Sequence, residues 1–186
     1  MDRSQASRRR LLDAGAAEFA AHGVAGARID RISGDAKVSK AQIYSYYDGK
    51  ESLFDAVLED QVNAILDRAP VTADLPGYAV RLYDAYLAQP QLVRLATWAR
   101  LERLPAGRLF PGSDDSAKIE IIAAAQREGR IRPDIPAEDI HSMVIALAMT
   151  WAPSSLTYTA TPADPPEDHE RRRAALAAAA RGAFML

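Results

Sequence analysis

The sequence contains no cysteine among its 186 residues. Disulfide bonds and thiolate metal sites are therefore excluded, and a reducing compartment is the natural setting for such a chain. Long apolar runs are also absent, since no segment reaches the roughly 18 apolar residues that a membrane-spanning helix requires. No apolar core follows the basic residues near the N-terminus, as it does in a secretory signal. We therefore expect a cytoplasmic protein without a membrane partner.

Residues that carry enzyme chemistry are few and isolated. The three histidines, His22, His141 and His169, lie far apart in the sequence, and no acid-rich cluster has the spacing of metal ligands. Neither a G-x-x-x-x-G-K phosphate loop nor an H-E-x-x-H zinc motif occurs. We therefore predict no catalytic residue, no metal site and no cofactor, and we do not expect an enzyme.

Alanine, leucine and arginine dominate the chain, and alternating β-branched runs are short. This composition favours an all-α fold. Apolar spacing and helix-ending residues predict about nine helices. Three short ones are expected before residue 48, a long one begins at residue 50, and the others are expected near residues 76–88, 90–104, 114–128, 136–152 and 167–184. The proline-rich segment between residues 153 and 167 is predicted to be an unusually long connector.

Charge is distributed unevenly along the chain. Nine of the 23 lysines and arginines lie in the first fifty residues, where they outnumber the acidic residues, although the net charge of the whole chain is −2. The asymmetry indicates a small basic domain that meets a polyanion and an acidic remainder that does not. We therefore divide the chain into a domain of residues 1–50 and a domain of residues 51–186.

The stretch VSKAQIYSYYDGKESL, residues 38–53, is rich in side chains that can both stack and form hydrogen bonds. Three short helices with a tight turn before Val38 have the layout of a helix-turn-helix, whose third helix enters the major groove of DNA. On a helix that begins at Ser39, Ile43 and Tyr47 face the core. The exposed or partly exposed positions are then Lys40, Gln42, Tyr44, Ser45 and Tyr46.

These exposed side chains have the chemistry of a DNA contact. The Gln42 amide can bond a base edge in two places, whereas lysines and hydroxyls suit phosphate oxygens. Arg28 and Lys50 stand at predicted helix starts, where free backbone N–H groups also attract phosphate. From periodicity alone another interpretation stays open, in which Tyr44 and Tyr46 only cover a neighbouring helix.

The run RRRLLDAGAAEFAAHGVAGARIDRISGDAKVSKAQIYSYYDGKESLFDAVL, residues 8–58, resembles the N-terminal DNA-binding domain of TetR-type transcriptional regulators. The shared pattern is a leucine-alanine helix, a glycine, an Ile-x-x-Ile helix, and V-S-x-x-x-[IL]-Y-x-[HY]-[FY]-x-x-K-E-x-L. The resemblance implies a homodimer whose subunits join a three-helix DNA-binding domain to a helical domain for ligand binding and dimerisation. The DNA contacts it implies are Arg28, Ser39, Lys40, Gln42, Tyr44, Ser45, Tyr46 and Lys50.

Two positions depart from the family pattern. Lys37 stands in the turn where the family usually has glycine, so it must accept an uncommon positive φ or shift the turn. Gly34 lies inside the second predicted helix where alanine is common, which costs roughly 1 kcal/mol of helix stability. Both departures concern the angle of the recognition helix.

The remaining two thirds of the chain has little sequence signature. A pocket for a small molecule is expected among the middle helices, although each of its candidate residues could equally be plain core. Glu102 shares a helical face with Trp98, which suits a lipophilic cation, although Glu102 could also be solvated and pair with a nearby arginine. The candidate ligand-binding residues are Tyr83, Tyr86, Leu95, Trp98, Glu102, Ile122, Met143 and Leu147.

The two helices expected at residues 136–152 and 167–184 are the clearest feature of this region. Two such helices from each subunit could form an intersubunit four-helix bundle, or they could pack within one subunit. The family resemblance favours the dimer. The candidate interface residues are Ile140, Val144, Trp151, Leu176, Ala177, Ala180 and Phe184.

Together these patterns predict a ligand-responsive transcriptional repressor. It binds a near-palindromic operator in double-stranded DNA as a dimer, and a small lipophilic effector, with a cation as one option, releases it. The alternative is a helical adaptor that binds protein without sequence-specific DNA binding. An adaptor explains the helical body but not the basic and tyrosine-rich head.

Overall fold

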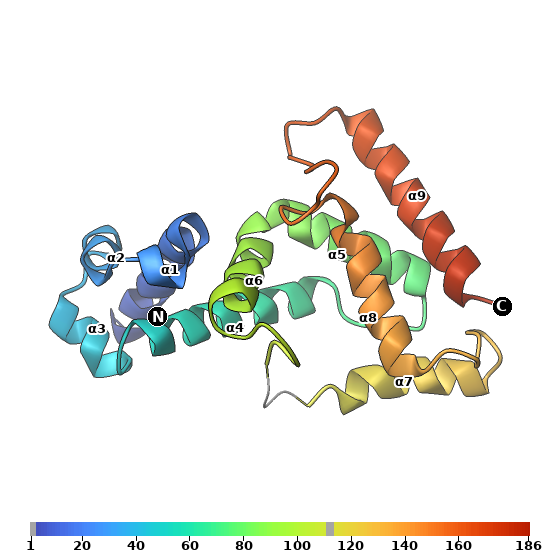
Figure 1. The fold of residues 1–186 in the computed structure, drawn as a ribbon, viewed down its shortest axis with the longest axis horizontal. Coiled ribbons are helices and arrows are strands. Elements are labelled where there is room, and N and C mark those ends of the chain that lie inside the picture. Colours follow the sequence, from blue (N-terminus) through green and yellow to red (C-terminus); the bar gives the residue numbers. More distant parts are fainter. Residues whose placement is uncertain (1–2, 111–113) are drawn as a thin grey trace. The chain divides into compact units, whose positions relative to one another are not determined.

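The computed structural model describes residues 3–110 and 114–186 (Figure 1). Within those ranges it contains nine α-helices, one short 3₁₀-helix (η1) and a single isolated bridge between Ile131 and Met185, which confirms the all-α prediction. No helix in these ranges is long and apolar enough to cross a membrane. The helices are α1 (Arg3–Gly26), α2 (Ile29–Ala36), α3 (Lys40–Tyr46), α4 (Lys50–Arg68), α5 (Leu75–Ala88), α6 (Pro90–Glu102), α7 (Ser116–Arg127), α8 (Ala137–Ala148), η1 (Met149–Trp151) and α9 (Pro166–Phe184).

The chain forms two compact units that are not two continuous halves. Unit 1 contains the residues up to Ala64 and the segment that begins at Gln91, whereas unit 2 contains Ile65–Pro90 and the segment that ends at Leu186. Helix α4 therefore contributes residues to both units, and nearly all of α6 groups with the N-terminal helices. The division at residue 50, which was drawn from charge, assigns α6 to the second domain, whereas in the structure α6 groups with the first unit.

Unit 1 is built around the apolar faces of α1 to α4. Phe19, Ile32, Ile43 and Phe54 are fully buried, and the rings of Phe19 and Phe54 meet edge to face with centroids 5.2 Å apart. Tyr47 is also buried, as predicted, so the recognition helix is anchored from beneath. Full burial of each large apolar side chain stabilises the fold by roughly 1.5–3 kcal/mol, so this small core fixes α3 against α1 and α2.

Helix α1 is kinked at Gly23 and continues beyond it. Gly23 has φ 69° and ψ −179°, a kink after which helical hydrogen bonding resumes as far as Gly26. A Cβ atom at Gly23 would lie 2.6 Å from Glu102 Oε1 and 2.9 Å from a ring carbon of Trp98. Both the backbone conformation and the close approach of α6 therefore require glycine at this position.

Unit 2 consists mainly of α5, α7, α8 and α9. Helix α5 packs against α8 and α9, and α7 packs against α8 (Figure 1). Tyr78, Ile122 and Ile131 are among its fully buried side chains. After η1, the connector of residues 152–165 leads to α9 without regular secondary structure, in agreement with the long connector predicted from its prolines.

Most residues predicted at a dimer interface lie inside unit 2. Their side chains are enclosed by the helices of the same chain and leave almost no surface for a partner. The apolar spacing identified the buried face of each helix correctly, but spacing cannot distinguish a face toward the chain's own core from one toward a second chain. Any interface on α8 and α9 must therefore use their other faces. Exposure is at most 2% for Ile140, Val144, Leu176, Ala180 and Phe184, while Ala177 and Trp151 are half-buried.

Candidate nucleic-acid interface

The recognition helix α3 is short and begins at a side-chain cap. Ser39 Oγ accepts a hydrogen bond from the Gln42 backbone N–H at 3.1 Å, and the Ser45 hydroxyl donates to the Gln42 carbonyl at 2.8 Å. Such a cap typically contributes about 1 kcal/mol to helix stability. The helix therefore has a defined first turn even though it spans only seven residues.

The polar residues of α3 form one accessible surface. Lys40, Tyr44 and Ser45 are exposed, with Tyr44 at 55% of its full accessibility, whereas Gln42 and Tyr46 are half-buried. Because Tyr44 lies on the outside, it does not cover a neighbouring helix. The structure thus leaves the predicted residues of α3 at least partly accessible, and their contact with DNA stays a prediction.

Some of these polar groups already have partners within the DNA-binding head, the helices α1 to α3. Lys40 forms an ion pair with Asp30 on α2, and this carboxylate raises the pKa of Lys40. The Tyr46 hydroxyl lies 3.1 Å from Ser4 Oγ, which ties α3 to the start of α1. A phosphate that approached Lys40 would compete with Asp30 for the ammonium group.

The turn between α2 and α3 adopts the conformation that glycine usually supplies. Lys37 has φ 54° and ψ 45°, the left-handed helical region, and it is the only non-glycine residue with positive φ among residues 3–110 and 114–186. The Ser33 hydroxyl donates to the Val38 carbonyl at 2.6 Å and closes the same turn. Lys37 therefore keeps the turn unshifted and carries the strain of a left-handed residue.

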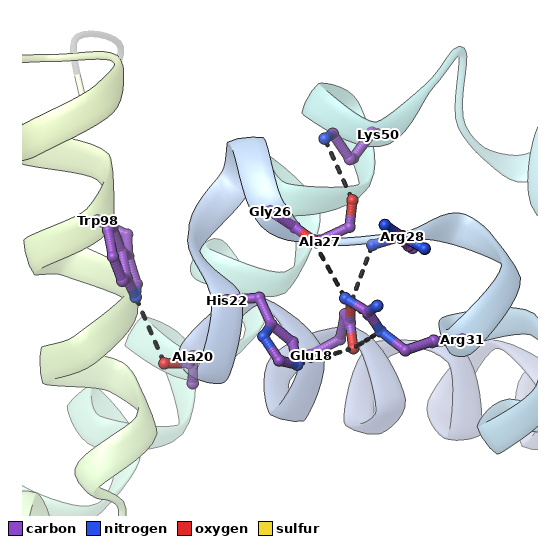
Figure 2. A network of polar contacts seen from close by, with 9 residues as sticks. All are labelled: Glu18, Ala20, His22, Gly26, Ala27, Arg28, Arg31, Lys50 and Trp98. Carbon is purple, nitrogen blue, oxygen red and sulfur yellow. Dashed lines mark hydrogen bonds and ion pairs between the residues drawn. The ribbon is translucent and has the colours of Figure 1, made fainter.

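Lys50, at the first turn of α4, binds the end of α1. Its ammonium group donates to the carbonyl oxygen of Ala25 at 3.1 Å. It also donates to the carbonyl oxygen of Ala27 at 3.2 Å (Figure 2). An ammonium group has three donors, so a third remains for a phosphate. Arg28, the residue before α2, has an exposed side chain.

A buried glutamate on α1 fixes the start of α2 (Figure 2). The Glu18 side chain is 5% exposed and accepts a hydrogen bond from the Arg28 backbone N–H at 2.8 Å. Arg31 donates to both carboxylate oxygens, from Nε at 2.8 and 3.0 Å, and its guanidinium also reaches the Gly26 carbonyl at 3.1 Å. The hydrogen bonds from Arg31 hold the pKa of Glu18 below its ordinary value. Glu18 thereby sets the angle of α2 against α1.

Helix α6 holds the kinked end of α1. The Trp98 indole N–H donates to the Ala20 carbonyl at 3.4 Å (Figure 2). Glu102 Oε2 accepts from the backbone N–H groups of Val24 at 2.8 Å and Ala25 at 2.9 Å. Glu102 thus caps a helical turn. The expected lipophilic cation would need Glu102 as a free carboxylate beside Trp98, whereas Glu102 Oε2 is already bound to two backbone N–H groups.

The predicted ligand-binding residues divide between the two units. Leu95, Trp98 and Glu102 belong to unit 1 through α6. Tyr83 and Tyr86 line a small cavity in unit 2 together with Trp151, which the sequence had placed at the dimer interface. Ile122 is fully buried, Leu147 is half-buried and Met143 is 37% exposed. Ligand contact stays a prediction for all of them.

Two features of the head were not predicted from the sequence. One is the clamp in which Glu18 binds the Arg28 N–H and the Arg31 guanidinium, and the other is the kink at Gly23. A signal for the first was present, because Leu11, Gly15 and Glu18 have i, i+4, i+7 spacing on the apolar face of helix α1. An acidic residue at a core position is almost never buried without a partner. No local pattern could have shown that Trp98 and Glu102 approach Gly23, because they lie more than seventy residues away in the sequence.

Comparison with known proteins agrees with this arrangement. Residues 11–57 match the bacterial regulatory proteins of the tetR family, and residues 74–181 match a tetracyclin repressor-like C-terminal domain. The HTH-type transcriptional repressor SCO4008 of Streptomyces coelicolor is 37% identical over 152 residues, which cover 80% of this chain and 79% of that protein. The HTH-type transcriptional repressor NicS of Pseudomonas putida is 31% identical over 160 residues, 77% of this chain and 75% of that protein.

A solved structure gives the same result for the whole chain. The crystal structure of the transcriptional regulator SCO4942 from Streptomyces coelicolor superposes with a TM-score of 0.79 at 35% identity, and the match covers 96% of this chain and 98% of that chain. These relatives are regulators of transcription rather than enzymes. The chain therefore belongs to the TetR family of bacterial transcriptional regulators.

Proposed function

We propose that this regulator is a repressor that binds a near-palindromic operator as a homodimer and leaves it when a small molecule binds the C-terminal helices. The observation that carries the proposal is the polar outer face of α3, held on a buried base of Ile43 and Tyr47. Two such helices one DNA turn apart, about 34–36 Å, read successive major grooves.

The residues of the head divide into readers of bases and binders of phosphate. Gln42 is the residue of α3 whose amide can bond an adenine edge in two places. Tyr44 and Ser45 are exposed hydroxyls suited to phosphate, and Arg28 and Lys50 stand beside the first turns of α2 and α4. Specificity then depends mainly on Gln42, whereas the others supply affinity that falls with salt.

Selection of binding sites from a random DNA pool tests this division. Gln42→Ala is expected to relax base preference at one position of each half-site, with a discrimination loss of about 1–3 kcal/mol there. Gln91→Ala, an exposed glutamine on α6, is the matched control and keeps the wild-type preference. An unchanged base preference for Gln42→Ala, or no selected sequence at all for the wild-type protein, contradicts the assignment.

The outer faces of α8 and α9 are the surface we assign to the second subunit. On α8, Met143 and Ala146 are exposed, and α9 presents a row of small exposed residues. Small side chains let helices approach closely, which suits an intersubunit helix bundle with the two-fold symmetry of a palindromic operator. The exposed small residues of α9 are Ala174, Ala175, Ala178, Ala179 and Gly182.

Analytical ultracentrifugation, which measures the oligomeric state, tests this interface. Ala178→Arg is expected to shift the protein from dimer to monomer and to reduce operator affinity, because a long charged side chain prevents close helix contact. Ala17→Arg, at an exposed alanine of α1, is the control and stays dimeric. A dimer that persists in Ala178→Arg at micromolar concentration places the interface on another surface.

We assign the coupling between effector binding and the DNA-binding head to α6. Its Trp98 and Glu102 hold the end of α1, and Arg103 pairs with Asp55 on α4 while its guanidinium lies 5.5 Å from the Phe54 ring centroid. An effector that favours a different position of α6 changes these contacts and thereby the population of heads competent for DNA. Glu102→Gln is expected to weaken operator binding even without effector, which anisotropy measurements with labelled operator detect.

A further inference from the structure

Unit 2 contains a small cavity with aromatic walls. Tyr83, Tyr86 and Leu87 come from α5 and Trp151 from η1. The Tyr83 and Trp151 rings meet in a T-shaped contact with centroids 5.9 Å apart. None of the lining residues carries a charge, since the others are Pro90, Ala148, Ala152, Pro153 and Ala160. We propose that this cavity is a closed site for a small, neutral aromatic molecule that carries a hydrogen-bonding group, and that the connector of residues 152–165 is its lid. This inference rests on the proposed function, because it names the class of effector.

The cavity is too small for such a guest in its present state. It offers a space of about 10 Å³, close to the roughly 10–15 Å³ that a single water requires. One wall must therefore move before an aromatic ring can enter. Three of the lining residues, Ala152, Pro153 and Ala160, belong to the connector, whereas α5 and α8 are held by packing within the core of unit 2.

Two buried polar atoms near this cavity lack a hydrogen-bond partner. The Tyr83 hydroxyl lies 2.6 Å from His169 Nδ1, and the second ring nitrogen of His169, Nε2, is buried without a partner among the described residues. Gln89 Oε1 is buried without a partner as well, and Gln89 lies between Leu87 and Pro90, which both line the cavity. Each unsatisfied buried group costs about 1–3 kcal/mol, so a guest whose hydrogen-bonding group reaches either atom removes that cost.

Charge argues against an ionised guest. Because no lining side chain is charged, an ion would lose its hydration without a counter-charge. Arg172, outside the lining, is already paired: it donates to Asp164 at 2.8 Å and lies 3.9 Å from Asp168, and the Arg172 and Asp164 side chains are 4% and 10% exposed. A neutral aromatic molecule fits the lining better than the lipophilic cation suggested by Glu102.

The same ion pair fastens the connector to α9. Asp164 accepts hydrogen bonds from Thr161 at 2.8 Å and from the Tyr158 hydroxyl at 3.1 Å, and the Arg172 guanidinium lies 5.0 Å from the Tyr158 ring centroid. These donors lower the pKa of Asp164 to about 2. The tip of the connector packs on nothing, since Leu156 is fully exposed. The lid is therefore held at Asp164 and by the hydrogen bond from the Ala160 N–H to the Trp151 carbonyl at 2.9 Å, whereas its tip is exposed.

Fluorine NMR of protein labelled with 5-fluorotryptophan tests the site. The chain has two tryptophans, so Trp151 reports on the cavity and Trp98, on α6, gives a separate signal outside it. Phenol and toluene are the probes, because they have nearly the same shape but only phenol forms hydrogen bonds. Saturable movement of the Trp151 signal, with phenol bound at least fivefold more tightly than toluene, is expected. No movement with either probe, or equal affinity for both, overturns the inference.

Filling the cavity supplies a matched pair of variants. Ala160→Leu places a larger side chain in the lining and is expected to abolish the Trp151 response to phenol, whereas Ala163→Leu, at an exposed connector position, preserves it. A response that survives in Ala160→Leu shows that phenol binds elsewhere and overturns the inference.

Weakening the lid tests its closure. Tyr158→Phe removes one bond to Asp164 while keeping the ring over Arg172, and Asp164→Asn removes the charge. If a rarely open lid limits binding, both variants bind phenol severalfold more tightly, because apparent affinity scales with the open fraction. Unchanged phenol affinity and unchanged binding rate in both variants overturn the assignment of the connector as a lid.

Operator binding, measured on the same samples, separates this inference from the proposed function. Wild-type protein without operator binding contradicts the function, whereas intact operator binding without a phenol response contradicts only the effector site.

Discussion

Replacement of Glu18 by glutamine tests whether the clamp between α1 and α2 fixes the DNA-binding head. The Glu18 carboxylate accepts the Arg28 backbone N–H and a forked pair of bonds from Arg31. A glutamine of the same shape offers one acceptor oxygen and turns an amide N–H₂ toward the guanidinium. With its oxygen in the Oε1 position, glutamine keeps the Arg28 N–H bond, but the Arg31 guanidinium loses the bond to Oε2 and its counter-charge.

The size of the effect follows from exposure. Bonds to a charged group contribute about 1.5–3 kcal/mol when buried, but the Arg31 side chain is 41% exposed, so solvent screens part of the ion pair. We expect Glu18→Gln to lower the free energy of unfolding by about 2 kcal/mol, which corresponds to about 4–8 °C in Tm for a chain of this size. Operator affinity falls as well, because α2 supports the turn that orients α3.

The matched control is Asp13→Asn on the same helix. Asp13 pairs with Arg9 one turn away, and its side chain is 58% exposed. Exposed pairs of this kind contribute about 0.5 kcal/mol or less. Thermal unfolding followed by circular dichroism compares the two variants. If Glu18→Gln costs no more than Asp13→Asn, the clamp does not stabilise the head and the reasoning from burial fails.

The clamp also has a defined pH dependence. The pKa of Glu18 is lowered in the folded protein, chiefly by Arg31. Its stabilisation is therefore complete above the ordinary carboxyl pKa of 4.5 and is lost as pH falls through the lower, folded value. The difference in stability between wild-type protein and Glu18→Gln should hence be constant above about pH 5 and shrink below it. A difference that grows on acidification refutes this assignment.

Three further substitutions test other parts of the head. Gly23→Ala is expected to cost about 3 kcal/mol of stability, because φ is 69° and the added Cβ meets α6; a normal melting temperature contradicts it. Gly34→Ala adds a Cβ that meets nothing within 4 Å and should raise stability by up to about 1 kcal/mol, with a lower Tm as the opposing result. Lys50→Met should reduce the slope of log affinity against log salt by about one, and an unchanged slope excludes a phosphate contact.

Local pattern was sufficient to predict the recognition helix and its anchoring. Ile43 and Tyr47 are buried and Tyr44 is exposed, as a helix that begins at Ser39 requires. Lys37 likewise had only two options in the turn, and the structure shows the positive φ. These outcomes depend on residues within a few positions of one another, where helical periodicity and backbone sterics dominate.

Local pattern did not show what covers a buried helical face or which group a side chain binds. Ile140 and Phe184 have helical apolar spacing whether a core or a second chain covers them, so spacing located a buried face without showing what buries it. Glu102 showed the same limit. Its helix position suggested a ligand carboxylate, and only the folded chain shows it capping the kink at Gly23.

The sequence by itself determined an all-helical chain with a helix-turn-helix head, because capping residues, helical periodicity and a family motif are local signals. Only the tertiary structure decided that α6 groups with that head, that Glu18 binds Arg28 and Arg31, and that Trp151 joins Tyr83 around a cavity under the connector. The physical reason is that each of these contacts joins residues whose separation along the chain carries no information about their distance in space, and packing of the whole unit selects them.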